Sequence, residues 1–253
     1  MTRLEENLRA VRARIDAAAR AAGRDPSSVS LLAVSKTWPA GDVRALAALG
    51  QLDFGENRVQ ELVDKAARLA DLPLRWHFVG QLQRNKAATV ARLGAVVHSV
   101  DRLSLARVLD RVGQEGGRPV EVLLQVDLGG AAGDTAARGG ADPAAVPELA
   151  DAVATAPGLR LRGLMAVAPR GEDPAPAFAR LAALAARVCA DHPDAVELSA
   201  GMSGDLEAAV EAGATVVRVG TALFGHRPLT SGEDRNTPAT RVTPATGAPG
   251  APA

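Results

Sequence analysis

Lys36 is the residue in this sequence best placed for covalent chemistry. It ends the apolar run LLAVSK at 31–36, and it is one of only three lysines among 29 basic residues. We expect it to be partly desolvated, and such a lysine can lose its proton and attack a carbonyl group, which an arginine cannot do. The alternative is a structural lysine that pairs with a carboxylate at a strand end. This run alone supports both interpretations equally.

Two glycine-bearing segments could hold an anion. In ELSAGMSGD at 197–205, Ser203 offers a hydroxyl beside the backbone N–H groups that begin a predicted helix. In RVGTALFG at 218–225, Gly220 lets a ligand approach the backbone and Thr221 offers a second hydroxyl. Ser203 alone would more often be a helix cap, and Asp205 must turn outward for an anion to bind. Together the two segments predict a phosphate site.

Arg218 supplies a cation that faces the same ligand. Strand parity puts Arg218 on the same face as Gly220, and the flanking valines on the opposite face. The alternative is an ion pair with an interior carboxylate such as Glu197. A lysine amine, an anion site and an interior arginine together suggest pyridoxal 5'-phosphate (PLP) held as a Schiff base, with the arginine facing the pyridine nitrogen.

Eight short apolar runs alternate with amphipathic segments between residues 29 and 225. This alternation is typical of parallel strands with crossover helices, and closure into a single (β/α)8 TIM-type barrel is the natural solution. An open doubly wound sheet would need a glycine-rich turn after the first strand, where this chain has SKTWP. We predict strands at 29–35, 52–54, 75–79, 95–99, 120–126, 159–165, 195–198 and 215–219. We predict connecting helices at 40–49, 57–70, 82–92, 103–112, 144–156, 175–190 and 204–212.

Polar side chains gather where the predicted strands end. Glu56 and Asn57 follow the second run, Asp127 the fifth and Ser199 the seventh. In parallel α/β folds the carboxyl ends of the strands carry ligands and catalytic groups. This distribution supports the barrel and predicts that Lys36 stands at its mouth.

The domain organisation is one barrel with short additions. Leu4, Leu8, Val11 and Ile15 predict an extra N-terminal helix, which a capping box at Thr2 begins. We expect the barrel domain to span residues 1–227 and a disordered tail, rich in proline, threonine, glycine and alanine, to span 228–253. The segment 127–143, with two glycine pairs, is predicted to be a mobile loop.

The bulk composition excludes several classes of partner. With 29 basic and 29 acidic residues, the chain is predicted to bind no nucleic acid and no anionic membrane. The N-terminus is charged, and no apolar stretch reaches membrane-spanning length. The single cysteine, Cys189, is expected to be a buried thiol in a reducing compartment. We therefore predict a cytoplasmic protein.

Six motifs follow one another along the chain: LAVSK at 32–36, FGENRVQE at 54–61, WHFVGQLQRNK at 76–86, GLM at 163–165, GMSGD at 201–205 and RVGT at 218–221. Together they resemble the pyridoxal phosphate homeostasis proteins (the YggS/PROSC group), in register from about residue 4 to residue 227. The resemblance implies a fold-type III PLP barrel, similar to the N-terminal domain of alanine racemase. It also implies a set of PLP-binding residues: Lys36 as the Schiff-base lysine, Arg218 near the pyridine nitrogen, Ser203, Gly220 and Thr221 around the phosphate, and Asn57, His77 and Met165 lining the pocket.

The fifth loop departs from the family pattern. Where relatives carry an asparagine and then a Lys-x-Gly, this chain has Asp127 and, later, Arg138-Gly139. The function of the family's loop lysine is therefore in doubt here, whereas cofactor binding is not.

Two absences favour a carrier of PLP over a racemase. The chain has no tyrosine to return a proton on the second face of a substrate, and no second β domain follows Gly225. Arg218 would also keep the pyridine nitrogen unprotonated, which weakens the ring as an electron sink.

We therefore expect a non-enzymatic, monomeric protein that binds no metal. It would hold PLP, supply it to apo PLP-dependent enzymes and, as the family implies, affect vitamin B6 and amino-acid balance. The alternatives are a weak PLP-dependent amino-acid racemase and a cofactor-free Schiff-base aldolase.

Overall fold

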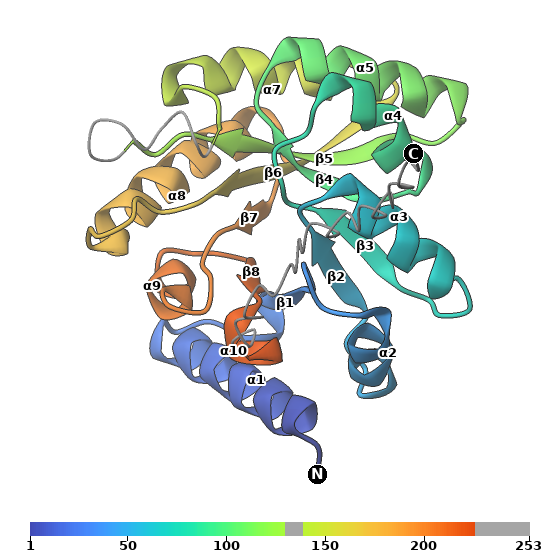
Figure 1. Cartoon of the computed structure of the whole chain (residues 1–253). Helices are drawn as coiled ribbons and strands as arrows, with labels where there is room; N and C mark the ends of the chain where they lie inside the picture. The colour runs from blue at the N-terminus through green and yellow to red at the C-terminus, as the bar shows by residue number, and fades with distance from the viewer. Residues whose placement is uncertain (130–138, 226–253) are drawn as a thin grey trace, which may run out of the picture.

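The computed structural model describes residues 1–129 and 139–225, and eight parallel strands close into one barrel (Figure 1). Each strand is hydrogen-bonded to the next, and β8 pairs with β1 in parallel register. The strands are β1 (Ser30–Val34), β2 (Asp53–Glu56), β3 (Arg75–Phe78), β4 (Val96–Val100), β5 (Val120–Val126), β6 (Leu159–Ala166), β7 (Glu197–Ser199) and β8 (Val216–Val219). The predicted (β/α)8 barrel is confirmed, and every predicted apolar run overlaps a strand.

Helices surround the barrel (Figure 1). They are α1 (Arg3–Ala21), α2 (Ala40–Ala48), α3 (Val59–Arg68), α4 (Arg84–Arg92), α5 (Leu103–Glu115), α7 (Val146–Ala154), α8 (Pro174–Asp191), α9 (Leu206–Glu211) and α10 (Thr221–Phe224), with short 3-10 helices at Pro26–Ser28 and Pro143–Ala145. The extra N-terminal helix and all seven predicted connecting helices are present. The helix α10 was not predicted, because four residues are too few to show a helical period.

The main apolar core lies between the barrel wall and the helices. Leu31 and Ala33 of β1 belong to this core, as do Val217 and Val219 of β8. Successive residues of a strand face opposite sides, so Arg218, between the two valines, faces the barrel interior, as parity predicted. Residues 32 and 34 of β1 face the interior for the same reason.

The barrel interior is partly apolar and partly polar. Val96, Leu123 and Met165 form a small apolar cluster that is separate from the main core. Several buried polar side chains also come from the strands, among them His77, His98, Gln125, Ser199 and Arg218. Barrel interiors are usually filled by branched apolar residues, and a buried polar group is costly unless it is hydrogen-bonded. The partners of these polar residues therefore bear on function.

The helix α1 packs against α9 and α10, beside the strands that close the barrel (Figure 1). Arg3 Nη1 donates to the carbonyl oxygen of Phe224 at 2.7 Å, and Asn7 Nδ2 donates to that of Leu223 at 2.8 Å. At the start of α1, Thr2 Oγ1 accepts a hydrogen bond from the Glu5 N–H at 3.3 Å, as the predicted cap requires. The N-terminal helix thus holds the turn that follows β8.

Some predictions are wrong or fall outside the described residues. Cys189 is half-buried rather than buried, because it lies beside the buried stripe of α8 that Leu181, Leu184 and Val188 form. The tail 228–253 lies outside the described residues, and so do Arg138 and most of the predicted mobile loop.

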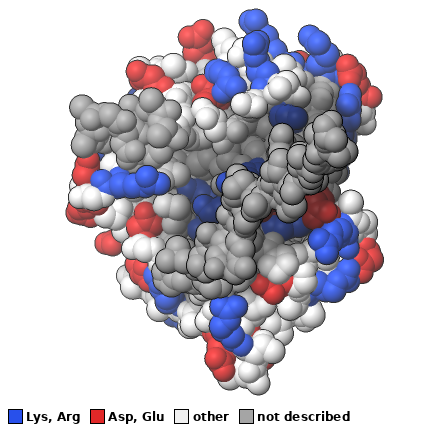
Figure 2. All heavy atoms as spheres, in the orientation of Figure 1, with Lys and Arg blue, Asp and Glu red and all other residues white. Residues whose placement is uncertain are grey.

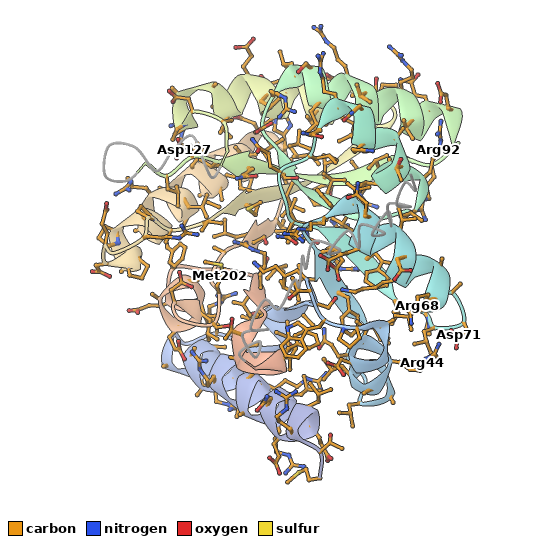
Figure 3. The ribbon with its side chains drawn as sticks, viewed as in Figure 1. Arg44, Arg68, Asp71, Arg92, Asp127 and Met202 are labelled. Atoms are coloured by element: carbon orange, nitrogen blue, oxygen red, sulfur yellow. The ribbon has the colours of Figure 1, made fainter. Side chains whose placement is uncertain are left out.

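The surface carries both signs of charge. On the face seen in Figure 2, basic and acidic side chains are interspersed around the molecule. Arg44 and Asp71 form a two-bond ion pair at the edge of the molecule, with N–O distances of 2.6 and 2.8 Å (Figure 3). Within the described residues, no helix is both long and apolar enough to cross a bilayer.

Candidate functional site

Lys36 lies on the turn that follows β1, at the carboxyl end of the barrel. β1 ends at Val34, and the neighbouring β8 is followed directly by Gly220 and Thr221. Because adjacent parallel strands end on the same side of a barrel, the lysine and the predicted phosphate segment occupy adjoining positions. The Lys36 side chain is exposed, so the expectation that it is desolvated is wrong.

The residue before Lys36 is held by a buried ion pair. Lys65 Nζ lies 2.5 Å from Glu56 Oε1, and their side chains are 5% and 0% exposed. Lys65 Nζ also donates to the backbone carbonyl oxygen of Ser35 at 2.7 Å, and the Ser35 hydroxyl donates to Glu56 Oε1 at 2.7 Å. Both the backbone and the side chain of Ser35 are thereby fixed from α3 and the end of β2.

The residue after Lys36 adopts a strained backbone conformation. Thr37 has a φ of 68°, in the left-handed region that β-branched residues rarely adopt. Its N–H donates to Glu61 Oε2 at 2.6 Å, and that same oxygen lies 3.5 Å from Lys65 Nζ. Strained residues persist only where the surrounding structure determines them, and they cluster at ligand sites. Three side chains, two of them acidic, therefore clamp the turn that presents Lys36.

The carboxylate of Glu56 is not fully satisfied by this network. Burial raises the pKa of Glu56, and the hydrogen bonds from Lys65 and Ser35 oppose that rise. Its Oε2 atom is buried and has no hydrogen-bond partner among the described residues. Removing Lys65 would leave the carboxylate buried without a counter-charge, which makes this pair important to the turn.

The two predicted halves of the phosphate site are joined in the structure. Ser203 Oγ accepts a hydrogen bond from the backbone N–H of Ala222 at 3.2 Å, which connects the loop after β7 to the turn after β8. A Cβ atom at Gly220 would lie 3.3 Å from the carbonyl oxygen of Val34, closer than nearly all such contacts. Ser203, Gly220 and Thr221 therefore meet beside the end of β1.

The carboxylate of Asp205 is hydrogen-bonded within its own loop. Asp205 Oδ1 accepts a hydrogen bond from the backbone N–H of Met202 at 2.6 Å, within its own loop. Met202 and Asp127, which follow β7 and β5, are labelled in Figure 3. The bond ties the carboxylate to the loop backbone, while its charge still acts on Arg218 and partly offsets the effect of burial on the pKa of that residue. That Asp205 turns outward for an anion stays a prediction.

Arg218 is buried in the barrel and makes three hydrogen bonds. Its Nη1 donates to the carbonyl oxygen and the hydroxyl of Ser199 at 2.6 and 2.9 Å, and its Nη2 donates to the carbonyl oxygen of Ala166 at 2.8 Å. Burial lowers the pKa of Arg218 to about 10, so it stays protonated at neutral pH. The alternative of an ion pair with Glu197 is wrong, because Glu197 pairs with Arg162 at 2.5 Å.

A chain of hydrogen bonds crosses the barrel interior from Arg218 to Asp53. Beyond Ser199, the chain continues from Ser199 Oγ to His98 Nδ1 at 3.0 Å, then from His98 Nε2 to His77 Nδ1 at 2.9 Å and from His77 Nε2 to Asp53 Oδ1 at 3.1 Å. An arginine can only donate and a carboxylate can only accept. The Ser199 hydroxyl therefore accepts from Arg218, and the Asp53 carboxylate accepts from His77. The directions of the two bonds between them are set by the tautomers of His98 and His77.

The pKa values of two further residues in this chain are shifted. Burial, and then the nearby positive charges, lower the pKa of His98 well below its ordinary value, so His98 is neutral. Burial raises the pKa of Asp53, but hydrogen bonds and charges from His77 and Arg75 outweigh burial and lower it overall. The chain therefore runs from the cation Arg218 through a neutral His98 to the anion Asp53.

His77 and Met165 lie inside the barrel rather than on its rim. Both ring nitrogens of His77 are used by His98 and Asp53, and the ring borders a small cavity at the N-terminal ends of the strands. Met165 is 1% exposed and packs in the interior apolar cluster. A direct contact between His77 and a cofactor stays a prediction, and so does one from Met165.

Asn57 follows β2 and is half-buried. Its Oδ1 atom is buried and has no hydrogen-bond partner among the described residues. The backbone of Asn57 is packed so closely under Gly80 that a Cβ atom at Gly80 would lie 2.2 Å from the Asn57 carbonyl oxygen. An acceptor held firmly and left unpaired suits a ligand that supplies a donor.

Several residues of this site escaped the sequence analysis. Lys65 was noted only as one of three lysines and Glu56 only as a residue after a strand, and their ion pair was not predicted. His98 and Asp53 were not considered at all. A histidine in the apolar run VVHSV at 96–100 was the one available signal for the interior chain.

Comparisons with known proteins show the family of this chain. Residues 6–228 match the family model described as the alanine racemase N-terminal domain. A pyridoxal phosphate homeostasis protein of Pseudomonas aeruginosa is 50% identical over 230 residues, covering 90% of this chain and 97% of that relative. The chain belongs to the pyridoxal phosphate homeostasis protein family. The resemblance drawn from the six motifs is therefore confirmed.

Other members of the family are similarly close. The pyridoxal phosphate homeostasis protein of Escherichia coli K12 is 43% identical over 233 residues, covering 90% of this chain and 98% of that relative. A solved structure of PipY from Synechococcus elongatus PCC7942, with PLP bound, is 40% identical and has a TM-score of 0.75, covering 88% of this chain and all of that chain. A homologue of this fold thus holds PLP.

Proposed function

We propose that this chain binds PLP as a Schiff base on Lys36 and keeps the cofactor available in the cytoplasm, with effects on vitamin B6 and amino-acid balance. The observation that carries the proposal is the adjacency of β1 and β8. The turn that carries Lys36 follows β1, Gly220 and Thr221 follow β8, and the Ser203 hydroxyl is hydrogen-bonded to the same turn as Thr221. The PLP-bound structure of PipY supports the assignment.

The chemistry of the residues at the barrel mouth fits PLP. When bound, PLP supplies an aldehyde carbon that forms a Schiff base with an amine, and Lys36 is the exposed lysine. Ser203 and Thr221 offer hydroxyls to the phosphate, and Gly220 leaves space that a Cβ atom would fill. The unpaired Oδ1 of Asn57 is an acceptor for a donor of the cofactor.

The interior residues would act beneath the cofactor ring. Arg218 is a donor on every nitrogen, so facing the pyridine nitrogen it would donate a hydrogen bond and keep that nitrogen unprotonated. Met165 would provide an apolar floor, and His77 would act on the site through His98 and Ser199. These interior residues would thus hold PLP and weaken the pyridine ring as an electron sink.

The same features favour a carrier over an enzyme. An unprotonated pyridine nitrogen is a poor electron sink for carbanion chemistry. The sequence contains no tyrosine that could act as a second acid or base. The relatives that cover most of this chain are named for PLP homeostasis rather than for a reaction. We therefore propose that the protein is a monomer and passes PLP to apo PLP-dependent enzymes.

Covalent attachment can be tested directly. The purified protein with PLP should absorb visible light, and borohydride should fix the cofactor on one peptide that contains Lys36. The variant Lys36→Ala should lose both signals, whereas Lys86→Ala, which alters a half-buried lysine of α4, should keep them. A colourless protein that gains nothing from added PLP would favour the cofactor-free aldolase instead.

The carrier role needs a separate experiment. The PLP-loaded protein is mixed with an apo PLP-dependent enzyme, and recovery of that enzyme's activity is compared with recovery from an equal amount of free PLP. Faster or more complete recovery from the loaded protein supports supply, and none beyond spontaneous release contradicts it. Incubation with single-enantiomer amino acids should leave their optical purity unchanged, and turnover that depends on Lys36 would favour the racemase.

A further inference from the structure

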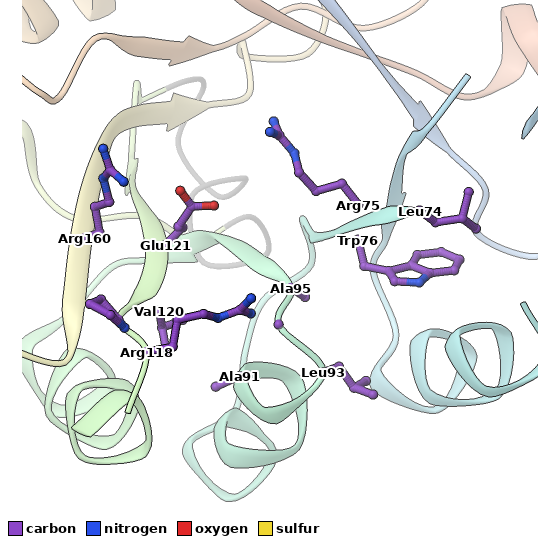
Figure 4. Close-up of a pocket in the computed structure, with 12 residues that line it drawn as sticks. Leu74, Arg75, Trp76, Ala91, Leu93, Ala95, Arg118, Val120, Glu121 and Arg160 are labelled. Carbon is purple, nitrogen blue, oxygen red and sulfur yellow. The ribbon is translucent and has the colours of Figure 1, made fainter. Parts of the chain in front are cut away.

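A cavity of about 510 Å³ lies at the end of the barrel opposite Lys36 (Figure 4). Its lining comes from the N-terminal ends of β3, β4, β5 and β6 and from the residues just before them. Arg75, Arg118 and Arg160 bring three guanidinium groups to its wall, with Glu121 as a single carboxylate. Cavities of this size hold small organic ligands.

Two of the three arginines are available to a ligand. Arg118 and Arg160 are exposed, and within the described part of the chain neither side chain has an ion-pair or hydrogen-bond partner. Glu121 does not neutralise them, because its Oε1 atom lies 3.1 Å from Arg162 Nη1. The wall of the cavity thus carries a net positive charge that other side chains have not taken up.

The rest of the wall is apolar. Leu74, Trp76 and Leu93 line the cavity, and Leu93 is 37% exposed, which is high for a leucine. Apolar surface beside cationic groups recognises an organic anion better than an inorganic one, since the anionic group meets arginine while the carbon body leaves water. The cavity is therefore suited to a small organic oxyanion, a carboxylate or a phosphate monoester.

The third arginine connects this cavity to the cofactor site. Arg75 Nε lies 2.8 Å from Asp53 Oδ1, the same oxygen that accepts the hydrogen bond from His77. A ligand oxyanion that binds Arg75 would compete with Asp53 for it. Asp53 ends the chain of hydrogen bonds that begins at Arg218, so the competition would change how that chain holds Arg218.

We propose that this cavity binds a small organic oxyanion and that its occupancy alters the retention of PLP at the other end of the barrel. The effect on PLP rests on the function proposed above, whereas binding in the cavity does not. By reciprocity, a ligand that weakens PLP binding is itself bound more weakly by the PLP-loaded protein. The site would make PLP release responsive to a metabolite.

The sequence offers a specific probe of the cavity. It contains two tryptophans, and Trp76 lies in the cavity wall. Trp38 stacks on Phe224, with ring centroids 5.7 Å apart. In the PLP-loaded Trp38→Phe protein the fluorescence reports on Trp76 alone, and phenyl phosphate and benzoate serve as probes because PLP already fills the phosphate site. We expect saturable changes in fluorescence with both probes or with one of them.

Variants at the exposed arginines distinguish specific binding of the probe in the cavity from nonspecific binding. Arg118→Gln together with Arg160→Gln should weaken the probe by roughly tenfold or more, since charge-assisted hydrogen bonds are the strong ones. Arg92→Gln, an exposed arginine of α4 outside the lining, should leave binding unchanged. Absence of saturable binding overturns the proposal, and so does equal binding by the double variant.

The link to PLP is read from the rate at which the visible absorbance of PLP is lost on dilution. A saturating probe should change this rate in the parent protein and not in Asp53→Asn, which keeps the shape of the residue but not its charge. A probe that binds in the cavity and leaves the rate unchanged overturns the link. A protein without visible absorbance contradicts PLP binding instead, while the Trp76 signal still reports on the cavity.

Discussion

Lys65 Nζ lies 2.7 Å from the backbone carbonyl oxygen of Ser35, the residue immediately before Lys36. The amine that binds this carbonyl also neutralises the buried carboxylate of Glu56 at 2.5 Å. One lysine therefore fixes the backbone position next to another. This arrangement makes the geometry of the Lys36 turn depend on a buried charge pair.

Lys65→Met should destabilise the protein and loosen PLP. The substitution leaves Glu56 buried without its counter-charge, which typically costs about 3–5 kcal/mol in the free energy of unfolding. Urea unfolding monitored by circular dichroism measures this cost. Lys65→Met combined with Glu56→Gln should recover much of the stability, because no buried charge then remains unpaired. Equal stability of Lys65→Met and the parent protein would contradict the buried pair.

Gly220→Ala should weaken PLP binding, whereas Gly204→Ala should not. The new Cβ atom at position 220 would lie 3.3 Å from the Val34 carbonyl oxygen, while one at position 204 would meet no heavy atom within 4 Å. We expect a dissociation constant for PLP roughly tenfold higher in the first variant, equivalent to about 1.4 kcal/mol. Titration with PLP, followed by visible absorbance, measures the dissociation constant of each variant. Identical curves would contradict the role of Gly220 in the phosphate site.

Ser199→Ala should affect the protein more than Ser99→Ala. The first removes the hydroxyl between Arg218 and His98, so it breaks the interior chain and costs about 1–3 kcal/mol of stability. The second removes a buried hydroxyl that has no hydrogen-bond partner among the described residues, so it should be neutral or stabilising. Because only the first disturbs Arg218, it alone should shift the visible absorbance maximum of bound PLP.

The stability of the protein should fall as pH decreases through the titration range of an unfolded histidine. Burial depresses the pKa of His98 in the folded state, so the unfolded chain binds a proton that the folded protein does not. The stabilisation is complete above the unfolded value of 6.5 and is lost below it, by at most about 1.4 kcal/mol per pH unit. Urea unfolding between pH 7.5 and roughly pH 5.5 measures this slope.

Variants of two histidines assign the pH effect. His98→Gln should be less stable at neutral pH and should flatten the slope, because no buried imidazole then remains at that position. His192→Gln, at a partly exposed histidine that pairs with Asp151 at 2.9 Å, should leave most of the slope. A slope that is the same in all three proteins would show that His98 titrates normally.

The barrel and the rim of the site were predictable because both follow from local patterns. Continuous apolar runs gave the strands, and the ends of those runs placed Lys36, Gly220 and Thr221. Parity alone placed Arg218 inside the barrel between Val217 and Val219. Each of these inferences uses residues that are neighbours in the sequence or repeat with a fixed period.

The hydrogen bonds that run from Arg218 to Asp53 inside the barrel were not predictable by the same means. Neither was the buried ion pair that fixes the turn before Lys36. The bond between His98 and Ser199 joins residues 101 positions apart, and it depends on the tilt and register with which the strands close. Lys65 meets Glu56 across nine positions that span a strand end, a turn and a helix, so no single period relates them. The carboxylate partner expected for Arg218 was wrong for a related reason, since Glu197 meets Arg162 of the neighbouring strand instead.

The scarcity of lysine has a consequence for a protein that handles a reactive aldehyde. The chain has 29 basic residues, of which three are lysines, and Lys36 is exposed whereas Lys65 is locked in an ion pair and Lys86 is half-buried. Arginine keeps its positive charge and does not condense with the aldehyde of PLP under these conditions. A surface rich in arginine therefore carries positive charge with few lysine amines that PLP could label. The composition itself therefore limits the number of lysines on which PLP could form a Schiff base.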